Sequence, residues 1–88
     1  SPAQRLRDLL RSRKRLLVMT HKNPDPDSLG GALGLQEFAR LAAGIDSRLA
    51  ISGKILRAEN QAMVRELGMQ MDRLDQTKIT DFDCFALV

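Results

Sequence analysis

One histidine and two aspartates stand close together near the start of the sequence. In the segment THKNPDPDSLGGALGL, residues 20 to 35, they are His21, Asp25 and Asp27. One imidazole and two carboxylates suit a borderline-hard divalent ion such as Mn²⁺, with Mg²⁺ as a competitor. Pro24 and Pro26 keep this segment out of helical geometry. An extended loop can turn both aspartates the same way, and their mutual repulsion would then favour a bound cation.

The same residues also have a purely structural interpretation. In it, Asn-Pro-Asp forms a turn, Asp27 caps the helix that follows, and His21 is an ordinary surface histidine. Three ligands cannot fill the octahedral shell of such an ion, and no other residue of the chain stands out as a further ligand. The residues alone therefore leave the metal site and the turn both open.

Several other binding motifs do not fit the sequence. An EF-hand that starts at Asp25 would have Leu29 at its fifth position, where an oxygen ligand is required, and Gln36 at its twelfth, where glutamate is required. The chain has no P-loop and no dinucleotide-binding glycine pattern, and it lacks the GxSxG elbow of serine hydrolases. These mismatches leave the His-x-x-x-Asp-x-Asp spacing as the main chemical signal.

Three glycines follow the loop at Gly30, Gly31 and Gly34. Each costs a helix roughly 0.5–1 kcal/mol relative to alanine. Two explanations fit equally well: a ligand or backbone must approach the helix closely, or the helix packs tightly on a sheet.

Apolar periodicity predicts three helices and four strands. Ser1 before Pro2 marks a helix start, Asp27 or Ser28 is a suitable cap for the second helix, and Gly44 and Gly68 are natural helix ends. Residues 52–54 form a turn. The expected helices are 2–12, 29–43 and 57–67, and the expected strands are 15–20, 45–51, 69–74 and 82–88.

This alternation predicts an α/β fold, with a mainly parallel sheet and flanking helices in the order α-β-α-β-α-β-β. The second helix carries apolar residues around most of its circumference, so we expect it to be largely buried. The segment His21–Asp27 follows the first strand, and ligands of open α/β sheets collect at the carboxyl ends of strands. Function is therefore expected first at this loop.

Composition limits the class of protein. The 88 residues suffice for one small domain, and an apolar content of 43% argues against disorder. The single cysteine, Cys84, excludes an internal disulfide, and we expect it to be a buried apolar residue. No stretch is long enough to span a membrane and no secretory signal is recognisable, which favours a cytoplasmic protein without a membrane partner.

The N-terminal segment is basic. Residues 1–22 contain a single acid, Asp8, and seven cations: Arg5, Arg7, Arg11, Arg13, Lys14, Arg15 and Lys22. Such a segment could contact a polyanion, or it could simply be the solvated face of an amphipathic helix.

At the loop the sequence resembles the DHH phosphoesterase superfamily. The first motif of that superfamily is an apolar strand, then His-x-Asn-Pro-Asp-x-Asp, a small residue, an apolar residue, glycine and a helix. Here it is LLVMTHKNPDPDSLGGALGL, and the resemblance is specific over about residues 15 to 35. The order of elements through residue 88 also fits the N-terminal half of the superfamily's catalytic domain. The resemblance thus implies that residues 1–88 are the N-terminal part of one DHH-type catalytic domain.

The resemblance also implies a mechanism. Members of the superfamily use two divalent ions, usually Mn²⁺, to hydrolyse phosphoester or phosphoanhydride bonds. By that likeness His21 and Asp25 would ligate one ion, and Asp27 the other. The second motif, an aspartate after the fourth strand, and the later Asp-His-His segment do not occur in these 88 residues. The expected enzyme is therefore a longer protein, of which residues 1–88 alone bind metal weakly and are inactive.

The branch of the superfamily is suggested by two features. A basic helix precedes the first strand, and residues 57–64 resemble the nano-RNase and RecJ-like branch. Enzymes of that branch hydrolyse phosphodiester or phosphomonoester bonds in short single-stranded oligonucleotides or nucleotides, some as exonucleases. A manganese-dependent inorganic pyrophosphatase is the alternative inside the superfamily. Outside it, the alternatives are a non-catalytic nucleotide-binding module and a nucleic-acid-binding domain that uses the cations between Arg5 and Arg15.

Overall fold

The computed structural model describes residues 1–21, 24–52 and 58–88. Four strands form one sheet in the order β3-β2-β1-β4, and every pair of neighbours is parallel. The strands are β1 (Arg15–Thr20), β2 (Asp46–Ile51), β3 (Met71–Arg73) and β4 (Cys84–Leu87). The helices are α1 (Pro2–Arg11), α2 (Pro26–Phe38) and α3 (Ala58–Glu66). The predicted α/β fold with a parallel sheet is confirmed.

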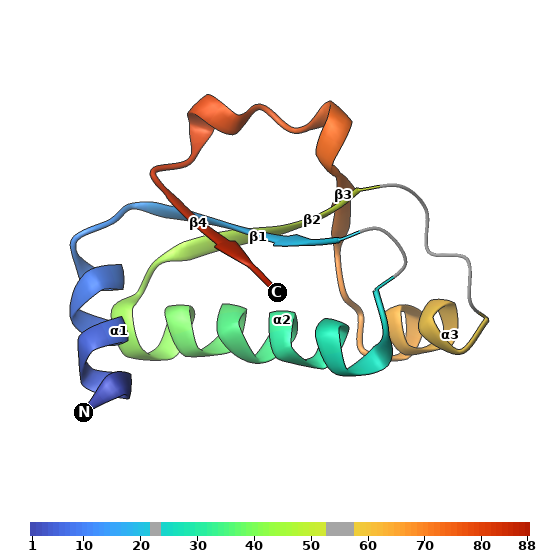
Figure 1. Cartoon of the computed structure of the whole chain (residues 1–88), viewed down its shortest axis with the longest axis horizontal. Coiled ribbons are helices and arrows are strands. Elements are labelled where there is room, and N and C mark those ends of the chain that lie inside the picture. Colours follow the sequence, from blue (N-terminus) through green and yellow to red (C-terminus); the bar gives the residue numbers. More distant parts are fainter. Residues whose placement is uncertain (22–23, 53–57) are drawn as a thin grey trace.

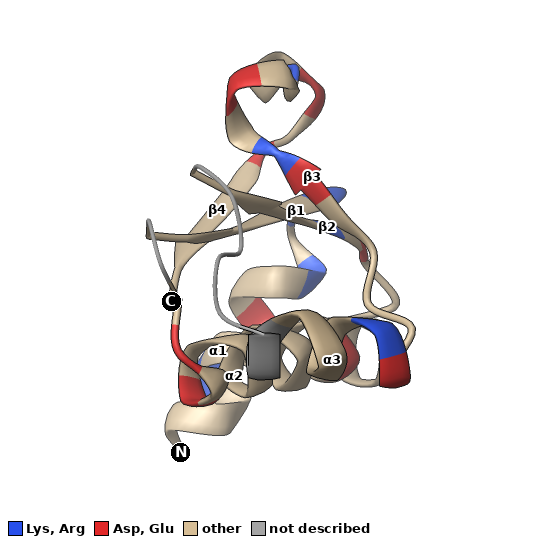
Figure 2. Ribbon diagram, turned by 90° about the vertical axis from the view of Figure 1, so that its right-hand side faces the viewer, with Lys and Arg blue, Asp and Glu red and all other residues tan. Residues whose placement is uncertain are grey.

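The molecule has three layers. All three helices lie on one side of the sheet, and residues 74–83 cross the other side, as Figures 1 and 2 show from two directions. Two short 3₁₀ turns, Leu74–Gln76 and Ile79–Asp81, build this crossing segment. No helix in the part of the chain that the structure describes is long and apolar enough to cross a membrane.

Strand β1 is buried on both faces. Leu16, Leu17 and Val18 are at most 1% exposed, as expected for an uninterrupted apolar run inside a parallel sheet. Leu16 and Val18 belong to the core beneath α2, which also includes Ala32 and Leu49. Leu17 alternates to the opposite face, the one that residues 74–83 cross.

The chain reverses its direction across the sheet at β1. From β1 it passes through α2 to β2 and through α3 to β3, always moving the same way. It then returns over the other face to β4, on the far side of β1. The connection that leaves β1 thus runs over one face of the sheet, and the connection that reaches β4 runs over the other. The strand order reverses between β1 and β4, and we call this gap the switch point of the sheet.

Several predicted boundaries need correction. Helix α2 begins at Pro26, not at Leu29, and continues into a π-helical turn, Ala39–Ala43, before Gly44 ends it with φ +64°. The short strand β3 replaces the one predicted over 69–74, because Leu74 already enters a 3₁₀ turn. The last strand is Cys84–Leu87 rather than 82–88, and α1 ends at Arg11. Most of the predicted turn at 52–54, and the predicted helix start at Arg57, lie outside the described residues.

Two burial predictions were wrong. Helix α2 was expected to be largely buried, yet only Leu29 and Ala32 are, because a single side of the helix meets the sheet. Cys84 was expected to be buried, but it is half-buried beside the core on an edge strand. Phe85 and Leu87, which also belong to this edge strand, are exposed.

Asp83 fixes the start of β4 against the start of β1. Its carboxylate accepts hydrogen bonds from the backbone N–H of Arg15 at 2.9 Å and of Lys14 at 3.0 Å. The Asp83 N–H donates in return to the Arg15 carbonyl at 3.2 Å. Donation by Arg15, and then by Lys14, lowers the pKa of the Asp83 carboxyl below its ordinary value of 3.8.

Folding stability should therefore depend on pH through Asp83. A carboxyl with a lowered folded pKa contributes stability that is complete above about pH 4 and is lost as the pH falls through the folded value. We expect Asp83→Ala to lower the free energy of unfolding at neutral pH and to flatten its decline in acid, as measured by urea denaturation across pH. Asp46→Ala is the control, since the Asp46 side chain has no hydrogen-bond partner among the described residues. An acid decline identical to wild type would contradict this role.

The double burial of β1 predicts a large cost for shortening its side chains. Leu17→Ala should lower the free energy of unfolding by about 2–5 kcal/mol. Leu17 is fully buried, so the substitution would leave a cavity between the sheet and the crossing segment. Leu41→Ala, at a side chain 72% exposed, should change it by no more than about 0.5 kcal/mol. Urea denaturation of both variants measures the difference. Equal effects would show that the crossing segment does not seal this face.

Candidate metal centre at the carboxyl edge of the sheet

The predicted metal loop lies at the switch point. It follows the last residue of β1, Thr20, and leads directly into α2. The end of β4 lies beside it, because the Val88 N–H donates to the Met19 carbonyl at 2.9 Å. Figure 1 shows the start of α2 below the sheet, near the carboxyl end of β1. The position is the one at which open α/β sheets bind ligands.

The structure places all three predicted ligands at this edge and leaves each of them exposed. His21 is the first residue after β1, Asp25 immediately precedes α2, and Asp27 lies in its first turn. Lys22 and Asn23, which complete the motif, lie outside the described residues. Within residues 1–21, 24–52 and 58–88, no three His, Cys, Asp or Glu side chains are grouped closely enough to hold a metal ion. The three ligands are thus neighbours at one edge without forming a converged cluster.

Asp25 caps α2. Its Oδ1 accepts from the Ser28 N–H at 2.8 Å, and its carbonyl accepts from the Leu29 N–H at 3.1 Å. The prediction that Asp27 or Ser28 would be the cap was wrong. A cap requires an extended backbone, and Pro26 imposes it on the residue before, where φ is −88° and ψ is 171°. Proline then fills the first helical position, which needs no N–H.

Capping and metal binding are compatible at Asp25. A carboxylate offers about four acceptor sites on its two oxygens, and the Ser28 bond uses one of them. Asp27 adds a second negative charge in the first turn, where the helix dipole favours it. The donor types therefore suit a divalent ion, although the three side chains are not grouped closely enough in this structure to hold one.

The three glycines of α2 differ in their surroundings. All three are exposed. A methyl group at Gly30 would lie 3.9 Å from Met63 Cε, and one at Gly31 would lie 3.4 Å from Val88 Cγ1. At Gly34 it would meet no atom within 4 Å. Packing against the end of the sheet can therefore explain Gly31 but not Gly34, and the close approach of a ligand stays a prediction.

Thr20 was missed by the sequence reasoning. It is 1% exposed and is the one buried polar or charged residue among those described. Its Oγ1 has no hydrogen-bond partner in the described part of the chain. Leaving a buried hydroxyl unpaired costs roughly 1–3 kcal/mol. Its position at the end of an apolar strand does not distinguish it in the sequence, because its burial and its lack of a partner appear only in the folded chain.

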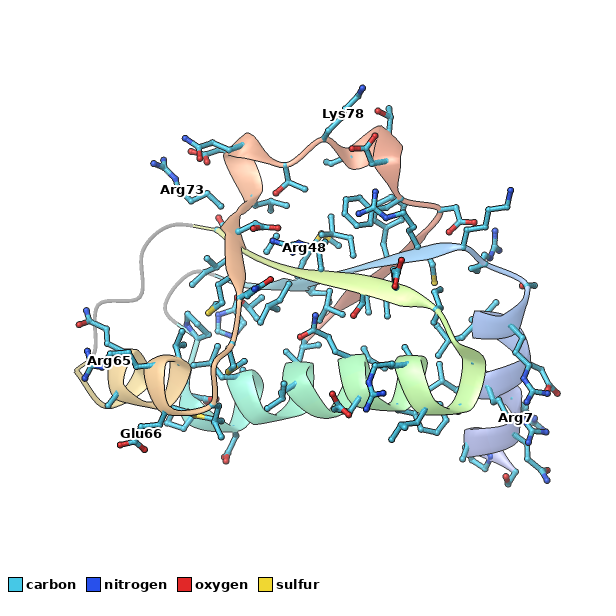
Figure 3. The ribbon with its side chains drawn as sticks, turned by 180° about the vertical axis from the view of Figure 1, so that it is seen from behind. Arg7, Arg48, Arg65, Glu66, Arg73 and Lys78 are labelled. Atoms are coloured by element: carbon cyan, nitrogen blue, oxygen red, sulfur yellow. The ribbon has the colours of Figure 1, made fainter. Side chains whose placement is uncertain are left out.

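A polar hollow of about 630 Å³ lies on the opposite face of the sheet, beneath the crossing segment. Its central cation, Arg48, is already neutralised by Asp72, through bonds of 2.8 Å from Nε and 2.6 Å from Nη2. This pairing lowers the pKa of Asp72. Figure 3 shows Arg48 beneath the crossing segment, whereas the side chains of Lys78 and Arg73 extend outward from that segment. None of the predicted ligands lines the hollow, so it is separate from the candidate centre.

Comparison with known proteins gives one match. Over 73 residues, 83% of this chain, the sequence is 34% identical to the uncharacterized protein MJ1633 of Methanocaldococcus jannaschii. The chain spans about 15% of the length of that relative. No family model and no solved structure matches the chain.

The two roles of Asp25 can be separated by substitution. Without metal, Asp25→Ala should lower the free energy of unfolding by about 1 kcal/mol, because the cap is lost, whereas Asp25→Asn should stay close to wild type, since asparagine caps as well as aspartate. Urea denaturation measures both. If Asp25→Asn were as unstable as Asp25→Ala, the charge of the carboxylate rather than its acceptor atom would stabilise the helix.

Proposed function

We propose that this chain supplies the first metal ligands of a metal-dependent phosphoesterase, a hydrolase acting on phosphodiester or phosphomonoester bonds of short oligonucleotides or nucleotides. The active enzyme is then a longer protein, consistent with the small share of the matched relative that the chain spans. Since substrates of this kind are intracellular, we propose the cytoplasm as its location.

One observation carries the proposal: the His-x-Asn-Pro-Asp-x-Asp motif lies at the switch point of a parallel sheet. The motif was identified from residue types alone, and the fold independently brings it to the expected ligand-binding edge. The resemblance also calls for a further aspartate after the fourth strand. That strand, β4, ends beside β1, within reach of the same loop.

The residues of the loop have distinct tasks in this proposal. His21 and Asp25 would hold one ion and Asp27 the other, and the cap at Ser28 would orient Asp25. Two Mn²⁺ or Mg²⁺ ions bound there would polarise the phosphoryl group and lower the pKa of a bound water. His21 must be neutral to bind metal, with one ring nitrogen left to donate a hydrogen bond.

The basic N-terminal segment gives less support to the alternative of a nucleic-acid-binding domain. Two of its arginines have structural contacts: Arg11 Nε donates to the Ala42 carbonyl at 3.2 Å, and the Arg15 guanidinium lies 4.7 Å from the centre of the Phe82 ring. Arg7 is partly buried, and its Nε lies 3.7 Å from Asp8 Oδ1. Arg5, Arg13 and Lys14 are exposed and could contact a substrate phosphate. They fit an accessory role better than a principal one.

The test is hydrolysis by the full-length protein with Mn²⁺. We expect cleavage of short single-stranded oligonucleotides or nucleotide phosphates, its loss on chelation, and near-complete loss in Asp27→Ala. Asp46→Ala, which removes an exposed carboxylate at the amino end of β2, should leave the rate unchanged.

Other outcomes would favour one of the alternative functions or contradict the enzyme. Hydrolysis of inorganic pyrophosphate alone would identify the pyrophosphatase alternative. Metal-independent binding of nucleic acid with a steep salt dependence, and no hydrolysis, would favour the binding domain. A full-length protein that hydrolyses no phosphoester with Mn²⁺ would contradict the enzyme.

A further inference from the structure

We propose that Thr20 is a positioning residue of the metal-binding loop. Its hydroxyl would donate a hydrogen bond to one of the two loop carboxylates, Asp25 or Asp27, when the ion is bound. This inference rests on the proposed function, because Thr20 acquires the role only if the loop holds an ion. The ligand motif itself starts one residue later, at His21.

The strand geometry places Thr20 on the side of the sheet that carries the loop's helix. Side chains alternate along β1, so Thr20 shares a face with Leu16 and Val18, which pack with Ala32 of α2. Its neighbour across the sheet is Ile51, at the carboxyl end of β2. Thr20 therefore lies on the side of the sheet that faces α2, at the end of β1 from which the loop departs.

The hydroxyl of Thr20 is a polar group in apolar surroundings. The strand residues next to it, Val18 on the same face and Ile51 on β2, are buried and apolar. At 1% exposure, bulk water does not reach the side chain, and Oγ1 has no hydrogen-bond partner among the described residues. Valine has nearly the same shape and would fill the position without an unpaired group. The hydroxyl is explained if a partner reaches it in another state of the protein.

The loop carboxylates are suitable partners. They are the acidic groups nearest in sequence, and both sit where α2 begins. A carboxylate can accept several hydrogen bonds on its two oxygens, and Asp25 accepts one of them from the Ser28 N–H. Hydrogen bonds that other residues make to metal-binding side chains orient those side chains, and their loss typically weakens metal affinity 10–100-fold. Thr20 would thereby fix a ligand that the structure shows exposed.

A pair of variants separates the hydroxyl from the shape of the side chain. In the full-length protein, Thr20→Val should weaken Mn²⁺ binding about 10–100-fold by isothermal titration calorimetry. Its melting temperature without metal should be equal to or above that of wild type. Thr20→Ser keeps the hydroxyl and loses a methyl group, so it should bind Mn²⁺ almost normally and melt earlier. Val18→Thr is the matched control, which adds a buried hydroxyl on the same face and should lower the melting temperature without changing Mn²⁺ affinity.

The outcomes distinguish this inference from the proposed function. Thr20→Val with wild-type Mn²⁺ affinity, alongside weakened binding in Asp27→Ala, would overturn the role of Thr20 alone. No Mn²⁺ binding by wild type, or equal binding by wild type and Asp27→Ala, would overturn both. A lowered melting temperature of Thr20→Val without metal, with unchanged affinity, would show that the hydroxyl is purely structural.

Discussion

The rest of the structure depends on the burial of β1 from both faces. An apolar strand with Leu16 and Val18 on one side and Leu17 on the other must be covered twice. The helices cover the first face and residues 74–83 cover the second. Covering both faces requires the chain to leave β1 on one side and to reach β4 from the other. The strand order reverses at the same place, beside the carboxyl end of β1 from which the loop departs.

The loop itself is determined by short-range chemistry. Pro26 forces Asp25 into the extended conformation that a helix cap needs, and the resulting bond to Ser28 begins α2 three residues before its first apolar residue. The same carboxylate is a predicted metal ligand. One residue thus joins the start of the helix to the candidate centre. The unpaired hydroxyl of Thr20 lies at the other end of the loop and carries a cost that the fold alone does not explain.

The sequence predicts the fold well where periodicity is strong. The buried run at 15–20 and the helix end at Gly44 were both identified, because an uninterrupted apolar strand and a left-handed glycine have few alternatives. The limits of β3 and β4 were overestimated, since 3₁₀ turns at Leu74 and Ile79 depend on how the chain must arch over the sheet. Side-chain patterns along one strand do not contain that information.

The candidate site was predictable in part for a similar reason. His21, Asp25 and Asp27 stand in a recognisable spacing, and the loop position follows from element order. The cap was misassigned because Asp25, Asp27 and Ser28 are all suitable residue types, and only the backbone angles decide among them. Thr20 could not be singled out, because its significance comes from burial and from a missing partner, which are properties of the folded chain.

The most direct test of the central claim is to locate the ion. A crystal structure of the full-length protein grown with Mn²⁺, with an anomalous difference map recorded at the manganese absorption edge, would do so. The account predicts strong peaks at the carboxyl edge of β1, bound by His21, Asp25 and Asp27. Manganese at full occupancy elsewhere, with these three side chains turned to solvent, would contradict it.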